Sequence, residues 1–470
     1  MVINFKDINI ESTPESPFEG DRLNRSNVVR TLYNLTNGLG KSGCVLALNA
    51  DWGAGKTTLI RMWRNFIEQQ GGKSLYFNAW ETDFVEDPLI ALMGELKVVF
   101  PDSSKDLISK CGRVAAKVGG TLIKDILKKS TGIDSDAISA GIDEVTSICI
   151  ENINEYENSK RELDEFRTAL IEFVASETNE KPIIFFIDEL DRCSPHYAIK
   201  VLERVKHLFE VPNIAFVVSV NINQLQYAVE GFYGSAKING KEYLRRFIDL
   251  EYTLPDPDFE NYVKVLFENF EFDSFFKTSA NSGILSRDQE EIVKLTAIDL
   301  LSKSNLSLRS INKIMANYRL VLYGYSPDTT TPLDLVFFLC FIKILHPDIY
   351  RKIKNYKYSL QDLLYTLENN LSPSLFADKE FQYTDKRMAY VISALLFAYN
   401  YKTRGIETEK EFKPITNGTD EPIFLIHPSR FDKIVLYEAL NWTYTKSINS
   451  LMNGLQRYFE NIEFINGIRW

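Results

Sequence analysis

The chain has 470 residues, of which 45% are hydrophobic and 25% charged, which is typical of a soluble globular protein with room for two or three domains. The net charge is −10, and an acidic balance repels nucleic acid and anionic membranes on average. The five cysteines are far apart and form no C-x-x-C pair, which excludes a disulfide framework or a zinc site and favours reduced thiols in the cytoplasm.

The sequence predicts no membrane span. The N-terminus, MVINFKDINIEST, is too polar for a secretory signal. The most apolar stretch, Leu333 to Leu345, is about half a bilayer span in length and contains Asp334 and Lys343. We therefore expect a core helix there and a cytoplasmic protein.

The first half of the chain alternates between helical and strand patterns. Residues 21–35, DRLNRSNVVRTLYNL, predict an amphipathic helix, and an apolar strand follows at 44–48. After a glycine-containing loop, residues 57–70 have helical periodicity, and SLYFNAW at 74–80 predicts a second strand. Residues from about 100 to 175 lack strong strand patterns and are predicted to form a helical insertion.

Three further strands are predicted at 182–188, 213–220 and 246–254. The first two are continuous apolar runs, as expected of parallel strands that helices cover on both faces. The third alternates, and four of its residues are expected to share one face: Ile248, Leu250, Tyr252 and Leu254. The fold class is therefore α/β, with a parallel sheet.

Helical patterns dominate after the segment Pro255-Asp256-Pro257, which is the predicted domain boundary. We expect a sheet-containing core at 1–257, a helical lid at 258–325 and a helical C-terminal domain at 326–470. The last is the expected interface for a partner or effector.

A phosphate-binding loop is predicted from A-D-W-G-A-G-K-T at 50–57, between the apolar strand and the amphipathic helix. Glycines let backbone N–H groups surround a phosphate, and the helix N-terminus adds its dipole. Lys56 is expected to reach the β- and γ-phosphates, and the Thr57 hydroxyl to bind Mg²⁺. The predicted nucleotide-binding residues of the loop are Trp52, Gly53, Ala54, Gly55, Lys56, Thr57 and Thr58. Ala50 replaces the consensus first glycine, and an ordinary glycine-rich turn is the alternative.

A second motif, P-I-I-F-F-I-D-E-L-D-R-C at 182–193, places Asp188 at the C-terminal end of a strand, where α/β sheets bind ligands. Asp188 is expected to hold the magnesium shell and Glu189 to polarise the attacking water. The alternative is an acidic cluster before a helix that Ser194 and Pro195 open. The order of the two motifs favours the catalytic interpretation.

Polar residues also end the strand at 213–220. Ser219 or Asn221 is placed to sense a γ-phosphate or to orient water. Asn221 is equally well placed to cap the helix that follows, and both interpretations stay open.

Arginines near the third strand are candidates for an arginine finger, a cation that stabilises the transition state. One of Arg245 and Arg246 is expected to act as the finger, across a subunit interface, and the other to pair with an acid such as Glu242 or Asp249. Arg309 is a further candidate, as a lid arginine.

The most basic aromatic stretch is R-K-I-K-N-Y-K-Y at 351–358. Aromatic residues interleaved with Lys and Arg can stack on bases and bind phosphates. A solvated charged face is the favoured alternative.

The sequence resembles the KAP family of P-loop NTPases over residues 15 to 320. The matching segments are DRL at 21–23, NADWGAGKTTL at 49–59, FNAW at 77–80, FFIDELDRCSP at 185–195 and YLRRFIDLEYTLP at 243–255. The D-E-L-D-R-C string is the most specific of these. The resemblance implies a sheet of the ASCE type, in which the hydrolytic acid stands beside the magnesium acid, with ATP and Mg²⁺ as ligands.

The resemblance also implies roles beyond the two motifs. Asp191 and Arg192 are expected at the active-site end, and Asn78 and Trp80 near the nucleotide. Many members carry transmembrane helices inserted in this domain, but residues 100–175 here contain charges throughout and no 18-residue apolar run. The match is therefore to the soluble bacterial type, which is associated with exclusion of bacteriophage.

We therefore expect an ATPase that couples its nucleotide cycle to conformational change or assembly in anti-phage defence. Its expected partners are ATP and either further copies of itself or an effector protein. The alternative is a nucleotide-gated scaffold that hydrolyses little ATP and recruits an effector. An effector that acts directly on nucleic acid has no support beyond residues 351–358.

Overall fold

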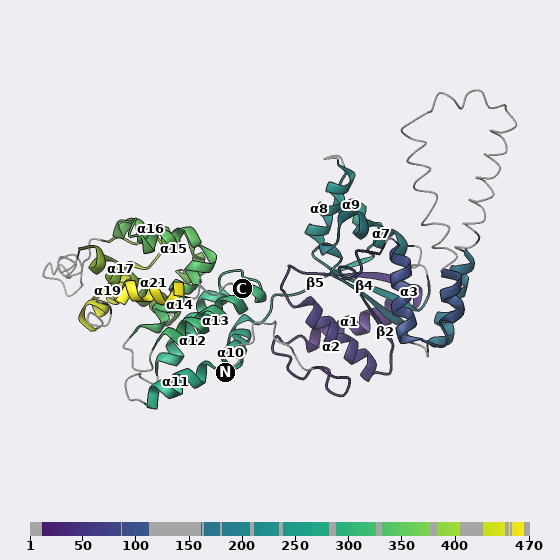
Figure 1. Cartoon of the computed structure of the whole chain (residues 1–470), viewed down its shortest axis with the longest axis horizontal. Helices are drawn as coiled ribbons and strands as arrows, with labels where there is room; N and C mark the ends of the chain where they lie inside the picture. Colours follow the sequence, from purple (N-terminus) through teal and green to yellow (C-terminus); the bar gives the residue numbers. More distant parts are fainter. Residues whose placement is uncertain are drawn as a thin grey trace, which may run out of the picture. The chain divides into compact units, whose positions relative to one another are not determined.

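The chain divides into two compact units, the first ending at Asp256 and the second beginning at Pro257 (Figure 1). The structure is a computed structural model. It describes residues 12–85, 87–111, 161, 164–178, 181–206, 211–234, 238–281, 288–325, 331–376, 383–404, 426–446, 451 and 454–464. Most of the predicted insertion at 100–175 lies outside these ranges.

The first unit is built on a five-stranded parallel sheet with the order β2-β3-β4-β1-β5. The strands are β1 (Cys44–Asn49), β2 (Ser74–Asn78), β3 (Ile183–Asp188), β4 (Ile214–Val220) and β5 (Leu250–Thr253). β4 separates the strand that precedes the glycine loop from the strand that ends in Asp188. This is the ASCE arrangement that the resemblance to the KAP family implied.

Helices cover both faces of the sheet, as the apolar runs predicted. In β3, Ile184 and Phe186 join a cluster with the helices α1 and α2, whereas Phe185 and Ile187 join a cluster with α3, α7 and α8. Alternate residues of a strand point to opposite faces, so a fully apolar strand contributes to two cores. Figure 1 shows α1 and α2 on one side of the sheet and α7 and α8 on the other.

The helices of this unit include the two predicted at 21–35 and 57–70. They are α1 (Ser26–Leu39), α2 (Lys56–Gln69), α3 (Pro88–Val99), α7 (Pro195–Lys206), α8 (Ile222–Tyr233) and α9 (Gly240–Leu244), with the 3₁₀ turns η1 (Gly40–Ser42) and η3 (Leu190–Arg192). The first begins five residues later than predicted because the carboxylate of Asp21 accepts hydrogen bonds from the N–H groups of Arg25 and Ser26.

The third predicted strand is shorter than expected, and one of its residues lies on the other face. β5 begins at Leu250, because residues 245–249 form a turn after α9. Leu254 and Tyr252 share one face, as predicted, and pack on the α1/α2 side, but Ile248 packs against the opposite cluster and Leu250 is 37% exposed. Strict alternation holds only where the backbone is extended.

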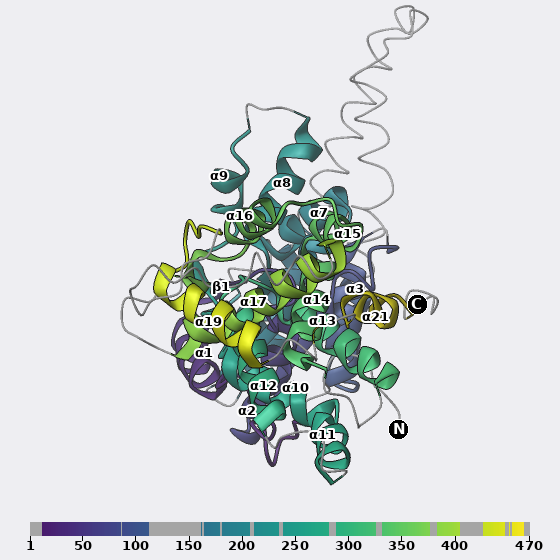
Figure 2. The same ribbon diagram turned by 90° about the vertical axis from the view of Figure 1, so that its left-hand side faces the viewer.

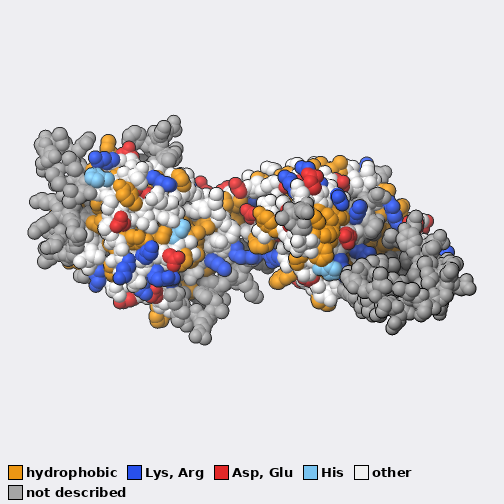
Figure 3. All heavy atoms as spheres, turned by 90° about the horizontal axis from the view of Figure 1, so that it is seen from above, with side chains coloured by type: hydrophobic (Ala, Val, Ile, Leu, Met, Phe, Trp, Pro, Cys, Tyr) orange, Lys and Arg blue, Asp and Glu red, His pale blue; other side chains and the backbone are white. Residues whose placement is uncertain are grey.

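Aromatic side chains of α8 lie on the surface of the first unit. Tyr227 is 62% exposed, and the neighbouring Phe232 and Tyr233 are about 40% exposed with their ring centroids 5.1 Å apart. Figure 3 shows hydrophobic side chains gathered on the viewed face of this unit. The apolar pattern of α8 therefore extends beyond the core.

The described residues of the second unit form helices and no strand. The helices are α10 (Phe259–Asn269), α11 (Phe272–Asn281), α12 (Asp288–Ser302), α13 (Leu308–Val321), α14 (Leu333–Leu345), α15 (Pro347–Lys354), α16 (Leu360–Asn370), α17 (Tyr383–Arg404), α19 (Lys433–Lys446) and α21 (Gly454–Phe464), with the 3₁₀ turns η4 (Leu322–Gly324) and η5 (Pro373–Leu375). The apolar stretch at 333–345 is the predicted core helix: α14 contacts α12, α13, α15 and α17, and lies among them in Figure 2. No helix in the described ranges has the length and hydropathy of a membrane span.

Candidate functional site

The loop between β1 and α2 has the backbone shape of a phosphate cradle. Gly53 and Gly55 adopt φ values of 79° and 88°, a left-handed conformation that favours glycine. Gly55 is the N-cap of α2, so the N–H groups of the first helical turn, beginning at Lys56 and Thr57, have no partner within the helix. These N–H groups and the helix dipole suit an anion.

The residue at the consensus first glycine does not distort the loop. Ala50 is buried, and its N–H donates to the carbonyl of Val220 at the end of β4 (3.1 Å). Its φ is not among the positive values, so a Cβ costs no backbone strain here. The loop therefore opens from the sheet without a glycine at this position.

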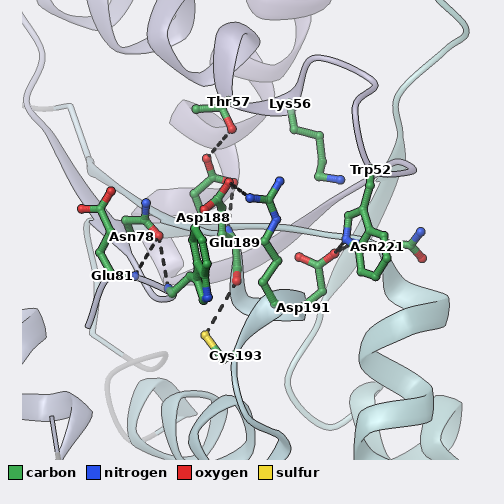
Figure 4. Close-up of polar contacts among 12 residues, drawn as sticks. Trp52, Lys56, Thr57, Asn78, Glu81, Asp188, Glu189, Asp191, Cys193 and Asn221 are labelled. Carbon is green, nitrogen blue, oxygen red and sulfur yellow. Dashed lines mark hydrogen bonds and ion pairs between the residues drawn. The ribbon is translucent and has the colours of Figure 1, made fainter. Parts of the chain in front are cut away.

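The lysine of the loop lies over the backbone that precedes it. Lys56 Nζ donates to the carbonyls of Ala50 (2.6 Å) and Asp51 (3.2 Å). Burial lowers the pKa of Lys56, and the nearby carboxylates of Asp191 and Asp188 oppose that shift. The ammonium therefore stands in a partly desolvated site between the loop and the acids (Figure 4).

The start of α2 meets the end of β3 directly. Thr57 Oγ1 donates to Asp188 Oδ2 at 2.9 Å, and Asp188 is 1% exposed. The hydroxyl of Tyr76, on β2, also lies 3.2 Å from Asp188 Oδ2. A hydroxyl and a carboxylate are hard oxygen donors, the ligands that Mg²⁺ takes while it keeps several waters. The residues present therefore fit the implied magnesium ion.

The acid after Asp188 is held in an unusual conformation. Glu189 has a φ of 62°, and it opens the 3₁₀ turn η3. Its Oε1 forms an ion pair with Arg192 Nη1 at 2.7 Å. Burial raises the pKa of Glu189, and the guanidinium of Arg192 opposes that shift. A positive φ in a non-glycine residue costs energy and is common at functional sites.

The third acid of the motif joins the loop to β4. Asp191 Oδ2 accepts hydrogen bonds from Trp52 Nε1 (2.5 Å) and from the backbone N–H of Asn221 (3.0 Å). Asn221 in turn donates from Nδ2 to Asp51 Oδ1 at 2.8 Å. The loop, η3 and the end of β4 therefore form one hydrogen-bonded group (Figure 4).

The two interpretations of the strand-end residues are compatible in the structure. Asn221 caps α8, because its Oδ1 accepts from the N–H of Gln224 at 3.2 Å, and its Nδ2 also reaches the loop. Ser219 is fully buried beside Asp188 in the sheet register, and its hydroxyl has no hydrogen-bond partner among the described residues.

The candidate finger arginines do not join this group. Arg245 forms an ion pair with Glu242 at 2.5 Å, and both side chains are exposed. Arg246 is also exposed, in the turn after α9, and no described hydrogen bond links either arginine to the loop. Arg309 lies in the first turn of α13, in the second unit.

The basic stretch at 351–358 forms part of α15 and the turn after it. Arg351 pairs with Asp348 at 3.2 Å, and Lys354 pairs with Glu463. Lys352 lies 5.8 Å from the ring centroid of Tyr358. Three of the basic side chains of this stretch therefore have partners within the second unit.

One member of the site, Tyr76, and one contact within the site did not stand out in the sequence. Tyr76 lies two residues before Asn78 on β2, so the period of a strand places both side chains on one face. Tyr76 could have been found from the sequence by counting back two residues along the strand from Asn78 of the FNAW segment. The Trp52–Asp191 bond joins residues 139 positions apart, and no local pattern encodes it.

The sheet order, the Gly-Lys-Thr loop at the start of α2 and the acid pair at the end of β3 define a P-loop NTPase fold of the ASCE type. The chain belongs to the KAP family: the family model described as "KAP family P-loop domain" matches residues 25–324. No curated protein matches the chain in a sequence comparison.

Three solved structures show distant likeness to the chain. The ORC2 protein of Aeropyrum pernix, in ADPNP–ADP complexes, aligns at 13% identity with a TM-score of 0.34, covering 98% of this chain and 88% of that one. The Aeropyrum pernix ORC1 protein in complex with DNA aligns at 13% identity with a TM-score of 0.31, covering 89% and 92%. Drosophila ORC bound to DNA gives 12% identity and a TM-score of 0.28, covering 97% and 98%. Likeness at this level does not extend to function.

Proposed function

We propose that the chain binds ATP with Mg²⁺ at the loop Asp51–Thr58 and hydrolyses it. The observation that carries this proposal is the contact between Thr57 and Asp188, which brings the helix start and the acid pair to one point (2.9 Å). Membership of the KAP family supports it.

Each residue has a distinct part in the proposed reaction. The N–H groups after Gly53 and Gly55 and the ammonium of Lys56 bind the phosphates, which concentrates positive charge where negative charge develops. Thr57 and Asp188 hold the magnesium ion, which screens the phosphate charge. Glu189 accepts a proton from the attacking water. The backbone of Trp52, Ala54 and Thr58 completes the loop, and Asn221 orients the terminal phosphate or the water.

An arginine finger is proposed to act between subunits. Arg245 is paired with Glu242, whereas Arg246 is exposed and forms no ion pair with the residues that the structure describes, which favours Arg246. A finger supplied by a second copy of the chain would couple hydrolysis to assembly. The helical lid at 258–325 and the domain at 326–470 are proposed to pass that cycle to an effector, in cytoplasmic anti-phage defence as the family analogy suggests.

A nucleotide-gated scaffold is the second candidate, and one observation favours it. The proposed base is held by Arg192 at 2.7 Å, and a paired carboxylate is a weaker base. In this case the chain would bind ATP and release little phosphate.

Purified wild type and Glu189→Gln decide between the two. We expect the wild type to release phosphate from Mg·ATP and the variant to bind ATP without releasing it. Molar mass measured by light scattering, with and without ATP, tests the assembly. ATP binding with no more phosphate release from the wild type than from the variant would leave the scaffold standing and exclude the ATPase.

A further inference from the structure

Arg192 lies between the proposed base and an exposed tryptophan. Its Nη1 is 2.7 Å from Glu189 Oε1, and its Cζ lies 5.7 Å from the ring centroid of Trp80. The arginine side chain is 29% exposed, and that of Glu189 is 17% exposed. Trp80 is 54% exposed, so the guanidinium stands at the mouth of the site.

The amide of Asn78, at the end of β2, is turned toward its own backbone. Its Oδ1 accepts the N–H groups of Trp80 (3.1 Å) and Glu81 (3.4 Å). Burial raises the pKa of Glu189, and Asn78 opposes that shift. The carboxylate of Glu189 is held by Arg192, a donor that does not belong to the attacking water.

The charge of Arg192 also acts on the phosphate-binding lysine. Burial lowers the pKa of Lys56, and Arg192 contributes to that shift, whereas the carboxylates of Asp191 and Asp188 oppose it. An incoming terminal phosphate would carry its charge into the field of these groups. A planar guanidinium suits phosphate oxygens at least as well as a carboxylate.

We propose that Arg192 is a γ-phosphate sensor that exchanges partners: it leaves Glu189 for the terminal phosphate of ATP, and this exchange frees Glu189 to take a proton from water. The inference rests on the proposed function and adds its regulation. ADP has no γ-phosphate, so with ADP the ion pair with Glu189 persists. The aromatic face of Trp80 supports the arginine in both positions.

The exchange predicts a preference for ATP that depends on two residues. Because Glu189 competes with the γ-phosphate for Arg192, removing the carboxylate charge must strengthen ATP binding, and only while the arginine is present. Such coupling between two residues is what a double-mutant cycle measures.

The test measures Kd for a non-hydrolysable ATP analogue and for ADP, both with Mg²⁺, in the wild type, Glu189→Gln, Arg192→Gln and the double variant. We expect Arg192→Gln to weaken binding of the analogue about tenfold, as for the loss of one charge-assisted contact, and to weaken binding of ADP less than about twofold. Glu189→Gln is expected to strengthen binding of the analogue roughly threefold or more while Arg192 is present, and to have no such effect once Arg192 is replaced.

Two further variants keep the test interpretable. Arg351→Gln removes an arginine with the same i,i+3 spacing to an acid, in the second unit, and should change neither Kd. If Arg192→Gln does not fold, as judged by thermal unfolding, Arg192→Lys keeps the charge without the planar fork and is expected to lose part of the ATP preference while keeping ADP affinity.

The outcomes separate this inference from the proposed function. If Arg192→Gln weakens the binding of both nucleotides equally, or if the effect of Glu189→Gln on affinity persists without Arg192, the sensor is overturned and nucleotide binding by the loop still stands. A wild-type chain that binds neither nucleotide overturns the proposed function and the sensor with it.

Discussion

Thr57 Oγ1 and Asp188 Oδ2 lie 2.9 Å apart, although the two residues are separated by 131 positions in the chain. Thr57 stands in the first turn of α2, which follows β1, and Asp188 stands at the end of β3. In the sheet, β4 lies between β1 and β3. The sheet therefore positions a hydroxyl and a carboxylate as a pair before any ligand arrives.

Replacing Lys56 by Ala should weaken ATP binding about 10- to 100-fold, because one or two charge-assisted contacts to phosphate are lost. Isothermal titration with Mg²⁺ and the non-hydrolysable analogue measures this. Lys41→Ala is the matched control, since Lys41 is exposed in η1, and it should bind like the wild type. Unchanged affinity in Lys56→Ala would refute the phosphate-binding loop.

Replacing Glu189 by Gln should reduce phosphate release roughly 10²- to 10⁴-fold, because the amide cannot accept the proton of the attacking water. Steady-state phosphate release at saturating Mg·ATP measures the rate. Nucleotide affinity, measured in parallel, should be kept or strengthened. A variant as active as the wild type would show that another group acts as the base.

As the pH is lowered, phosphate release should be lost at a higher pH than it would be if the base were a glutamate with an ordinary pKa. Burial raises the pKa of Glu189 from its usual 4.5. Only the ionised form accepts a proton, so activity is present above the raised pKa and is lost as the pH falls through it. The measurement is kcat against pH at saturating Mg·ATP. An acid limb at or below pH 4.5 would contradict the burial of this carboxylate.

Replacing Glu368 by Ala should destabilise the second unit by at least about 3 kcal/mol. Glu368 is fully buried, and its carboxylate accepts the backbone N–H groups of Ser429, Arg430 and Phe431 at 2.9–3.1 Å. The substitution leaves these donors without their partner. Calorimetric unfolding measures the change.

The control for that variant is Glu438→Ala. Glu438 is 55% exposed and lies 3.7 Å from Lys386, and an exposed pair of this kind contributes at most about 1 kcal/mol. Similar unfolding temperatures for the two variants would show that the buried carboxylate does not hold residues 429–431 in place.

Much of the site follows from local sequence patterns. A fully apolar run that ends in Asp188 forms a strand, and its first polar residues stand at the ligand-binding edge. The glycines and helical periodicity around Lys56 likewise specify a strand, a turn and a helix. These features depend on neighbours in the sequence, so they could be predicted from it.

Other features depend on contacts that no local pattern contains. The positive φ of Glu189 and its ion pair with Arg192 arise from the tight turn after β3. Ile248 was assigned to the wrong face because the turn at 245–249 interrupts the alternation. The hydroxyl of Tyr76 reaches Asp188 only because β2 and β3 are neighbours in the sheet.

The place of β5 in the sheet has a consequence for how the chain is made. β1 pairs with β4 on one side and with β5 on the other, in the register Leu46↔Leu250 to Asn49↔Thr253. During synthesis β1 leaves the ribosome before either of its neighbours in the sheet has been made. A chain that ends before residue 250 leaves β1 with one open edge, and an unpaired strand edge is a template for aggregation. We therefore expect such a shortened chain to aggregate.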